Sequence, residues 1–474
     1  MLIKGRACYY FKNYSQALEE FDNVLKIDPD NAEAYSGRSL VNSNKLIKFN
    51  QAKKERDKAV NLNPNLVEDL IKRGDSFVGY KNYERAIETY NDALKIKSDS
   101  ALAYDKRGLA YFNLKKYDAA IKDFNKAIKL DPNFADAHVD LGKVFTEQKK
   151  YHQAVVEYDK ALELDPNSVS AYANRGRAYD DLKEYQKALT DLNRAIELDQ
   201  NFAQAYTTRA HVYFYLNNYE AAMEDCNKAL ELDPTLAKAY NTRGAIYANS
   251  NDFDKAMENF SKAIQYDSNF AMPYRNLGWL YCYIFKQYDA ALENYNKTIE
   301  LDPSFVDAYN DRGNLYNDIL KEHELAIKDF NKAIETDPNY FWAYSNRGNA
   351  YRNLKQYELA LKDYDKAIEL DPNNDNVYIN RGWLYLETKN YEAAIKDYDK
   401  ALELNPNDFE TYVNRGVAYG QLKQYEQAIQ NFNKALELNP NAATAYNLRG
   451  LCYQELGDAE KAQADLDKAR QLGY

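Results

Sequence analysis

Histidines and cysteines are the residues of this sequence best suited to catalysis or metal binding, but they stand far apart in the chain. The histidines are His138, His152, His211 and His323, and the cysteines are Cys8, Cys226, Cys282 and Cys452. A catalytic or metal centre needs several such side chains to converge, and these spacings match no metal or disulfide pattern. We expect scattered structural or surface histidines and cysteines that fill the core. No cofactor, metal site or catalytic site is predicted, so the chain is not expected to be an enzyme.

The charge of the chain narrows the class of partner. Its 474 residues carry a net charge of −11, and the acidic residues interleave with lysines. Binding nucleic acid requires a surplus of Lys and Arg that neutralises phosphates, so no nucleic-acid partner is expected. The negative charge is compatible with a partner protein that offers a basic segment. No apolar run is long enough to cross a bilayer, and the few cysteines fit a reducing compartment, so we expect no membrane insertion and a cytoplasmic protein.

The elements that must carry any site are repeats of 34 residues. The block RGLAYFNLKKYDAAIKDFNKAIKLDPN at Arg107 returns as RGRAYDDLKEYQKALTDLNRAIELDQN at Arg175 and as RGNAYRNLKQYELALKDYDKAIELDPN at Arg347. About fourteen such units fill the chain. A fixed period of this length is typical of a solenoid, in which each unit packs only on its neighbours.

Each unit contains two apolar patterns with helical spacing. In the unit that begins near residue 101, Tyr104, Gly108 and Tyr111 share one helix face, and Phe124 lies on the face of the next helix. Small residues let two antiparallel helices approach, and the aromatic rings fill the remaining space. Ten of the eleven prolines stand where the second helix should end, as Pro132 does, because proline cannot continue a helix.

Three units contain one extra residue. The intervals that end at Gly74, Gly313 and Gly348 are 35 residues long. We assign each extra residue to the turn between the two helices, because turns accept insertions at low cost.

The order of these positions resembles the tetratricopeptide repeat. A small residue is followed by Tyr three residues later, Ala twelve later, an aromatic sixteen later and Pro twenty-four later, in a variant with Tyr and Arg-Gly where the family has Trp and Leu-Gly. The resemblance implies an all-α fold, a right-handed α-solenoid superhelix of antiparallel helical hairpins, in which the first helices line a concave groove. One solenoid would span residues 1–474.

Two regions depart from this pattern. The second repeat, at about residues 32–66, is degenerate, with Ser39, Asn42 and Arg56 where Gly, Tyr and Phe are expected. Residues 458–472 are expected to form a C-terminal capping helix, since the ends of a solenoid need a polar outer face.

An arginine before the small residue recurs in most units, with an acidic residue sixteen positions later. Examples are Arg107 with Asp123, Arg175 with Asp191, Arg347 with Asp363 and Arg381 with Asp397. A row of arginines facing a ligand is the alternative. We favour ion pairs between the two helices of a hairpin, because the pattern accompanies the fold everywhere.

The candidates for partner binding are residues that break the repeat. By resemblance to the family, the tryptophans point from first helices into the groove, and a partial row of asparagines is similar to the asparagine ladder of the nucleocytoplasmic sugar transferase that modifies Ser and Thr. Exposed Trp is frequent in binding hot spots, and an amide can pair with the backbone of a peptide. The alternatives are that Asn merely tolerates a polar position and that Trp braces neighbouring helices. The candidates are Asn276, Trp279, Trp342, Asn346, Asn349, Asn380, Trp383 and Asn414.

The clamp by which some family members hold the carboxylates of chaperone tails is incomplete here. Asn349 and Asn380 supply part of it, but Ser345 replaces the first Lys, and Glu410 and Asn414 replace the last Lys and Arg. We expect weak or no binding of acidic C-terminal tails.

Together these patterns predict a non-catalytic scaffold that binds extended peptide segments of partner proteins in a groove centred on residues 276–421. The alternative is the substrate-recruiting arm of a larger enzyme or assembly whose catalytic part lies outside this chain. Homo-oligomer formation through the solenoid ends stays open and is not predicted.

Overall fold

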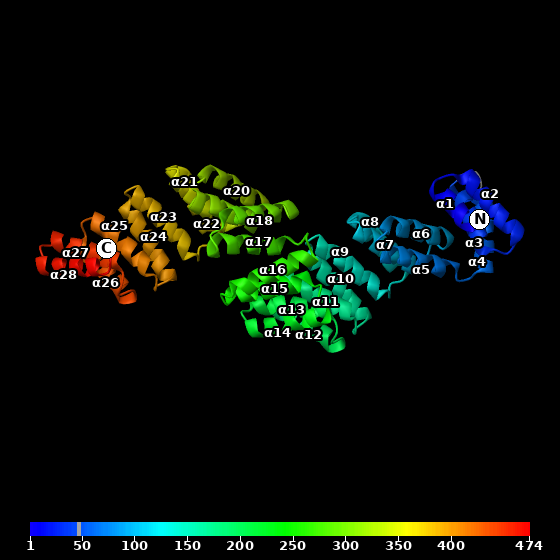
Figure 1. Cartoon of the computed structure of the whole chain (residues 1–474), viewed down its shortest axis with the longest axis horizontal. Helices are drawn as coiled ribbons and strands as arrows, with labels where there is room; N and C mark the ends of the chain where they lie inside the picture. Colours follow the sequence, from blue (N-terminus) through cyan, green and yellow to red (C-terminus); the bar gives the residue numbers. More distant parts are fainter. Residues whose placement is uncertain (45–48) are drawn as a thin grey trace. The chain divides into compact units, whose positions relative to one another are not determined.

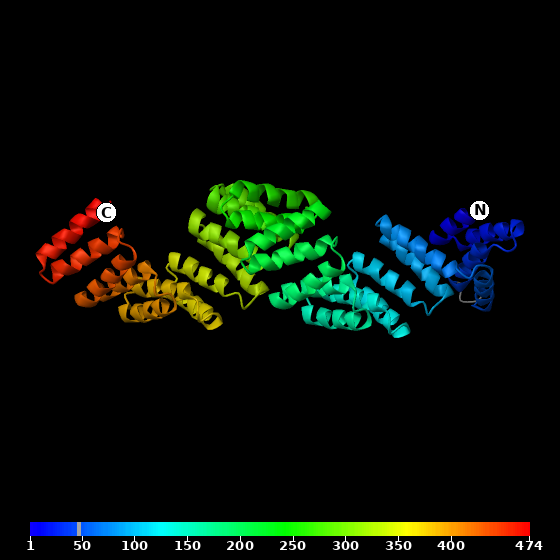
Figure 2. The same ribbon diagram turned by 90° about the horizontal axis from the view of Figure 1, so that it is seen from below.

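The computed structural model describes residues 1–44 and 49–474, which form helices joined by short turns (Figure 1). Along this part of the chain there is no β-strand, and successive helices pair as hairpins (Figure 2). The predicted all-α class of tandem antiparallel hairpins is therefore confirmed.

In chain order the described helices alternate between a first and a second helix of the repeat, fourteen of each. The first helices are α1 (Leu2–Tyr10), α3 (Ala32–Asn44), α5 (Leu66–Gly79), α7 (Ala101–Asn113), α9 (Ala135–Glu147), α11 (Val169–Asp181), α13 (Ala203–Tyr215), α15 (Ala237–Asn249), α17 (Ala271–Trp279), α19 (Val306–Asn314), α21 (Phe341–Asn353), α23 (Asp375–Glu387), α25 (Phe409–Gln421) and α27 (Ala443–Glu455). The second helices are α2 (Tyr14–Ile27), α4 (Phe49–Leu62), α6 (Tyr83–Ile96), α8 (Tyr117–Leu130), α10 (Tyr151–Leu164), α12 (Tyr185–Leu198), α14 (Tyr219–Leu232), α16 (Phe253–Tyr266), α18 (Tyr288–Leu301), α20 (His323–Thr336), α22 (Tyr357–Leu370), α24 (Tyr391–Leu404), α26 (Tyr425–Leu438) and α28 (Ala459–Gln471).

The chain divides into two compact units, Met1–Ile246 and Tyr247–Tyr474. Within each unit a hairpin packs on the next, so each core is a row of small clusters. A single solenoid over residues 1–474 stays a prediction.

In most hairpins a glycine of the first helix packs against a side chain of the second helix, usually an aromatic ring. A Cβ atom added to Gly382 would lie 2.7 Å from Cε1 of Tyr398, whose side chain is fully buried. Where the first helix carries Ala210 in place of glycine, the second carries Cys226 in place of the ring, and both are buried in one cluster. The two positions therefore complement each other in size, and the predicted core role of Cys226 is confirmed.

This complementarity predicts the effect of enlarging a glycine. Gly382→Ala should destabilise the second unit by about 1–3 kcal/mol, because the new methyl group displaces the ring of Tyr398. Adding Tyr398→Cys, which copies the pair of Ala210 and Cys226, should recover part of the loss. Urea denaturation followed by circular dichroism measures both changes. A double variant less stable than Gly382→Ala would contradict the size argument.

The turn between the helices of a hairpin uses a left-handed residue. Lys115 has φ of 58°, and eleven other Lys and Asn residues at the equivalent position have φ between 56° and 61°. The amide of the next residue, Lys116, donates to the carbonyl of Tyr111 at 2.9 Å and so closes the end of α7. The sequence analysis missed this turn, because glycine is the usual residue for this conformation.

Two of the three extra residues lie inside a helix, so the prediction that turns absorb them is wrong for these two units. α17 continues into the π-helix η1 (Leu280–Ile284), and α19 continues into η2 (Leu315–Leu320). In η1 the amide of Phe285 donates to the carbonyl of Leu280, five residues earlier, at 3.0 Å. A π-turn holds one more residue than an α-turn, so it takes up the insertion and keeps the helix continuous. The insertion before Gly74 lies outside the described residues.

The degenerate second hairpin is held by polar contacts. The hydroxyl of Ser39 donates to the carbonyl of Ala52 at 2.8 Å, and Nδ2 of Asn42 donates to Oε2 of Glu55 at 2.8 Å. Arg56 reaches α6, where Nη1 donates to the carbonyl of Lys95 at 3.1 Å. Hydrogen bonds here replace the packing of a glycine against a ring.

Candidate functional site

The four histidines lie apart from one another in the structure, three of them in contact with different side chains. His138 contacts Glu157 through Nδ1 at 2.7 Å, and His211 contacts Asp180 at 2.7 Å. His323 contacts Asn317 at 2.8 Å, and His152 is exposed. The residues that the structure describes contain no group of His, Cys, Asp and Glu that could hold a metal ion. The prediction of scattered histidines is confirmed.

The recurring arginines form ion pairs within and between hairpins, and we call each such arginine with its acidic partners an arginine clasp. Arg381 donates from Nε and Nη2 to the two oxygens of Asp397 at 2.8 and 2.7 Å, and from Nη1 to Asp365 of the preceding hairpin at 2.6 Å. The same pairing within a hairpin joins Arg107 and Asp123, Arg175 and Asp191, Arg209 and Asp225, Arg312 and Asp329, Arg347 and Asp363, and Arg449 and Asp465. The predicted ion pairs are confirmed, and these arginines bind the chain itself.

The three tryptophans are half-exposed on first helices, with exposed fractions of 40% for Trp279, 38% for Trp342 and 42% for Trp383. The ring of Trp279 lies 5.8 Å from that of Tyr283, and the ring of Trp342 lies 4.5 Å from that of Phe341. Among the described residues no aromatic ring stacks on Trp383, although Phe409 lines the same hollow.

Most of the candidate asparagines take part in contacts within the chain. Nδ2 of Asn346 donates to Oδ1 of Asn310 on the preceding first helix at 2.9 Å, and Nδ2 of Asn380 lies 3.4 Å from Oγ of Ser345, also on the preceding first helix. Oδ1 of Asn349 accepts the hydroxyl of Tyr364 at 2.7 Å. Asn276 is half-buried on α17. These amides link neighbouring helices, which leaves less of them for a ligand.

Asn414 differs from the other asparagines. Its equivalent neighbour on the preceding first helix is Ile379, which offers no polar atom, whereas Asn380 faces Ser345. The amide of Asn414 makes no hydrogen bond with any described residue and lines a hollow at the surface. Its donor and acceptor are therefore available to a partner.

This hollow, which we call the Trp383 hollow, has a volume of about 750 Å³ and is lined by α23, α25 and the start of α27. Its apolar lining comes from Ile379, Trp383, Phe409 and Val413. Its polar lining includes the amides of Asn376 and Asn414 and the carboxylates of Asp375, Asp408 and Glu410. Such a mixture of apolar surface and a few polar groups suits a bound segment of protein. Of the sequence candidates, only Trp383 and Asn414 meet here.

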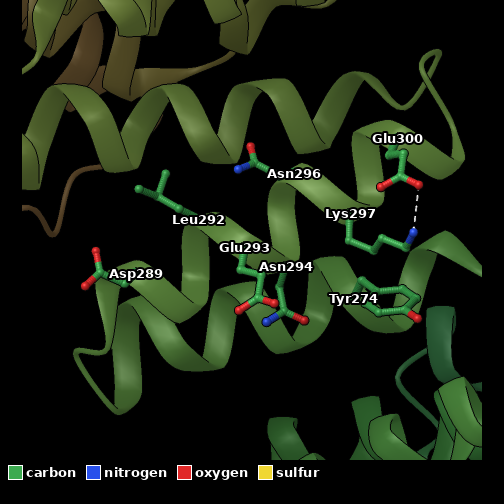
Figure 3. A pocket seen from close by; sticks show the side chains of 8 residues that line it. All are labelled: Tyr274, Asp289, Leu292, Glu293, Asn294, Asn296, Lys297 and Glu300. Atoms are coloured by element: carbon green, nitrogen blue, oxygen red, sulfur yellow. Dashed lines mark hydrogen bonds and ion pairs between the residues drawn. The ribbon is translucent and has the colours of Figure 1, made fainter.

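A second hollow, of about 720 Å³, lies on α18 beside Tyr274 of α17 (Figure 3). Lys297 crosses it and pairs with Glu300 at 2.8 Å. The same pair recurs on other second helices, as Lys332 with Glu335, Lys366 with Glu369, Lys400 with Glu403 and Lys434 with Glu437. It therefore belongs to the common surface of the repeat and marks no particular site.

Family models match most of the chain. The model described as "Tetratricopeptide repeat" matches residues 169–202, 203–236, 237–270, 341–374, 376–408 and 409–442, and a second model of that description matches 431–464. The model described as "TPR repeat" matches residues 74–115, 108–149, 142–183, 282–318 and 319–355. The chain belongs to the tetratricopeptide repeat family. Residues 1–73, which include the polar second hairpin, lie outside these matches.

Two relatives are similar to this chain over short segments. Hsp70-Hsp90 organizing protein 3 of Arabidopsis thaliana is 27% identical over 92 residues, which are 19% of this chain and 16% of that protein. Small glutamine-rich tetratricopeptide repeat-containing protein 2 of Saccharomyces cerevisiae is 29% identical over 104 residues, 21% of this chain and 28% of that protein. The chain thus matches less than a third of the length of either relative.

Among solved structures, the APC/C hetero-tetramer Cut9-Hcn1 has a fold similar to that of this chain. The match covers 99% of this chain and 93% of that chain, with a TM-score of 0.54 and 18% identity. At this identity the likeness concerns the fold alone. No described helix of the present chain has the length and apolar character to cross a membrane.

The positions that sequence reasoning missed are Ile379, Phe409 and Val413. They are ordinary apolar residues, and single-sequence inspection gives no reason to separate them from the core. Aligning the repeats in register provides the signal. Ile379 occupies the position at which Asn310 and Ser345 contact the asparagine of the next first helix, so Asn414 finds no polar partner there.

Proposed function

We propose that this protein is a non-catalytic interaction scaffold whose Trp383 hollow binds extended segments of partner proteins. The observation that carries the proposal is that one hollow brings together an exposed tryptophan without a stacked ring and an asparagine amide without a hydrogen-bond partner among the described residues. Trp supplies binding energy through its large apolar area, and the amide can pair with a peptide backbone.

The family and the relatives support a scaffold. The tetratricopeptide match covers most of the chain, and one relative is named as an organizing protein for Hsp70 and Hsp90. The departures at Ser345, Glu410 and Asn414 from the carboxylate clamp lead us to expect partners other than acidic chaperone tails. Four free cysteines, three of them buried, suit a protein that works in the cytoplasm. Recruitment of substrates for a larger enzyme remains the second candidate, because a scaffold of this kind would serve either role.

Affinity capture tests the proposal. The unaltered chain and the double variant Trp383→Ala, Asn414→Ala are immobilised and exposed to lysate from the source organism. Proteins captured by the unaltered chain should bind the double variant at least about thirtyfold more weakly, because truncation of a hot spot costs about 2 kcal/mol or more. Mass spectrometry with quantification of each captured protein gives the ratio.

The matched control is Leu359→Ala, which removes an exposed apolar side chain from α22, outside the hollow. Its capture should equal that of the unaltered chain, and circular dichroism should show the same helicity for all three proteins. Equal capture by the double variant would place binding elsewhere and refute the Trp383 hollow as the site.

A further inference from the structure

We propose that the Trp383 hollow selects a partner segment in which a lysine or arginine adjoins an aliphatic residue, with the cation held at Glu410. The inference rests on the proposed function and adds to it the chemistry of the partner. Three observations support it: the negative charge of the lining, a second place in the chain where an arginine occupies the equivalent positions, and the open face of Trp383.

The hollow is negative and has no cation of its own. Asp375, Asp408 and Glu410 line it, whereas no Lys or Arg does. Asp375 accepts from the amide of Asn405 at 3.0 Å, and Asp408 accepts the hydroxyl of Thr411, both neutral donors. Glu410 is exposed, and its carboxylate forms no hydrogen bond or ion pair with any described residue. A positive group from a partner would therefore meet uncompensated charge.

The chain itself shows which group suits this arrangement. On α17 and α19, Nε of Arg275 donates to Oδ2 of Asp311 on the next first helix at 2.7 Å. Although burial opposes its charge, the carboxylates of Asp311 and Asp307 raise the pKa of Arg275. A guanidinium from the preceding first helix is thus paired with Asp311 and further stabilised by the charge of Asp307, one helical turn earlier.

The same three positions recur at the Trp383 hollow with the cation missing. Counted from the start of each unit, Ile379 stands at the position of Arg275, Asn414 at that of Asp311 and Glu410 at that of Asp307. The acidic residue of the first turn is retained while the guanidinium is replaced by an aliphatic side chain. A partner that brings its own cation completes the arrangement, with the amide of Asn414 as a second acceptor.

Trp383 and its apolar neighbours favour a cation with an aliphatic residue beside it. An indole face is the strongest aromatic partner for a cation, and no cation of the described residues lies over this ring. Elsewhere the chain makes such contacts often, for example between Arg381 and the ring of Tyr385 at 6.0 Å. Ile379 and Val413 continue the apolar lining, which favours an aliphatic side chain beside the cation.

A displayed library of random ten-residue peptides tests the inference on the full chain. Selection on the unaltered protein should enrich peptides with Lys or Arg beside Leu, Ile or Val, and synthetic copies of them should bind more weakly as salt rises. For those peptides Glu410→Gln should lower the affinity about five- to tenfold. Peptides whose cation is replaced by glutamine should bind with an affinity that depends neither on salt nor on the Glu410→Gln substitution.

The matched control is Glu426→Gln, which removes an exposed carboxylate from the first turn of α26, outside the hollow. It should leave the affinity within about twofold, which separates a local contact from attraction by the net charge of −11. Enriched peptides that are neutral or acidic, or equal effects of the two variants, would overturn the inference and leave the proposed function standing. If no peptide is enriched, the proposed function fails with it.

Discussion

Replacing Asp105 with valine is expected to raise the stability of the first unit at pH 8 by roughly 3 kcal/mol, and by much less at pH 4. Asp105 lies on α7 with 1% of its surface exposed, and neither carboxylate oxygen accepts a hydrogen bond from the residues described here. The nearest cation is Nζ of Lys106, 3.8 Å from Oδ2. Val139 occupies the same position in the next hairpin and is buried, so valine fits there.

The direction of the pH effect follows from the environment of the carboxyl group. Burial, reinforced by the negative charge of Asp140, raises the pKa of Asp105 from 3.8 to about 7. The folded chain therefore keeps this proton up to about pH 7, whereas the unfolded chain releases it near pH 4. Stability that is present below pH 4 is lost as the pH rises to 7, because the folded state must then hold a buried charge.

Thermal and urea denaturation of both proteins at pH 4 and pH 8 measure the effect. Asp118→Asn serves as the control, because it removes an exposed carboxylate of α8 and should show little pH dependence relative to the unaltered chain. A gain from Asp105→Val that is the same at both pH values would show that the carboxyl group does not titrate in this range.

Replacing Arg381 with alanine is expected to destabilise the second unit by about 3–5 kcal/mol, because it leaves the buried carboxylate of Asp397 without its counter-ion. Burial raises the pKa of Asp397, and Arg381 opposes this shift. The arginine also holds Asp365 of the preceding hairpin, so its loss weakens two interfaces. Urea denaturation gives the total cost, and hydrogen exchange should show faster opening of α22, α23 and α24.

The chain contains a neutral version of this clasp, which supplies the control. Nε of Arg415 donates to Oδ1 of Asn431 at 2.8 Å, at a position where seven other hairpins have an aspartate. Asp397→Asn reproduces that pair and should cost less than about 1.5 kcal/mol, since no charge is left buried alone. If Asp397→Asn were as harmful as Arg381→Ala, the loss would come from packing and not from the unpaired carboxylate.

The hairpins and their arginine clasps could be predicted because both repeat. Each copy of the period is a separate observation of the same packing, so Arg107 and Asp123 inform the interpretation of Arg381 and Asp397. The place of the extra residues could not be predicted in this way. A turn and a π-helix can each absorb one residue, and the choice depends on the packing around Leu280 and Leu315, both fully buried.

The candidate site was predictable in part. Trp383 and Asn414 were found because they differ from the common pattern. The distinction between Asn414 and Asn380 was missed, since both are the same residue at the same position of the repeat. It depends on whether Ile379 or Ser345 faces them from the preceding first helix, and the contact between these positions is known only from the structure.

The two π-helices have consequences for how such a chain could evolve by duplication of repeats and how it could be engineered. Arg312 and Asp329 are seventeen residues apart across η2, one more than in the regular hairpins, yet Nη2 still reaches Oδ1 at 2.6 Å. A hairpin can thus accept one extra residue within its first helix and keep the ion pair between its arginine and its aspartate. Duplication or exchange of the segments around η1 and η2 would carry this altered helix to a new place in the array. For engineering, these two hairpins are variants to be moved whole, and trimming them to 34 residues would remove the π-turn.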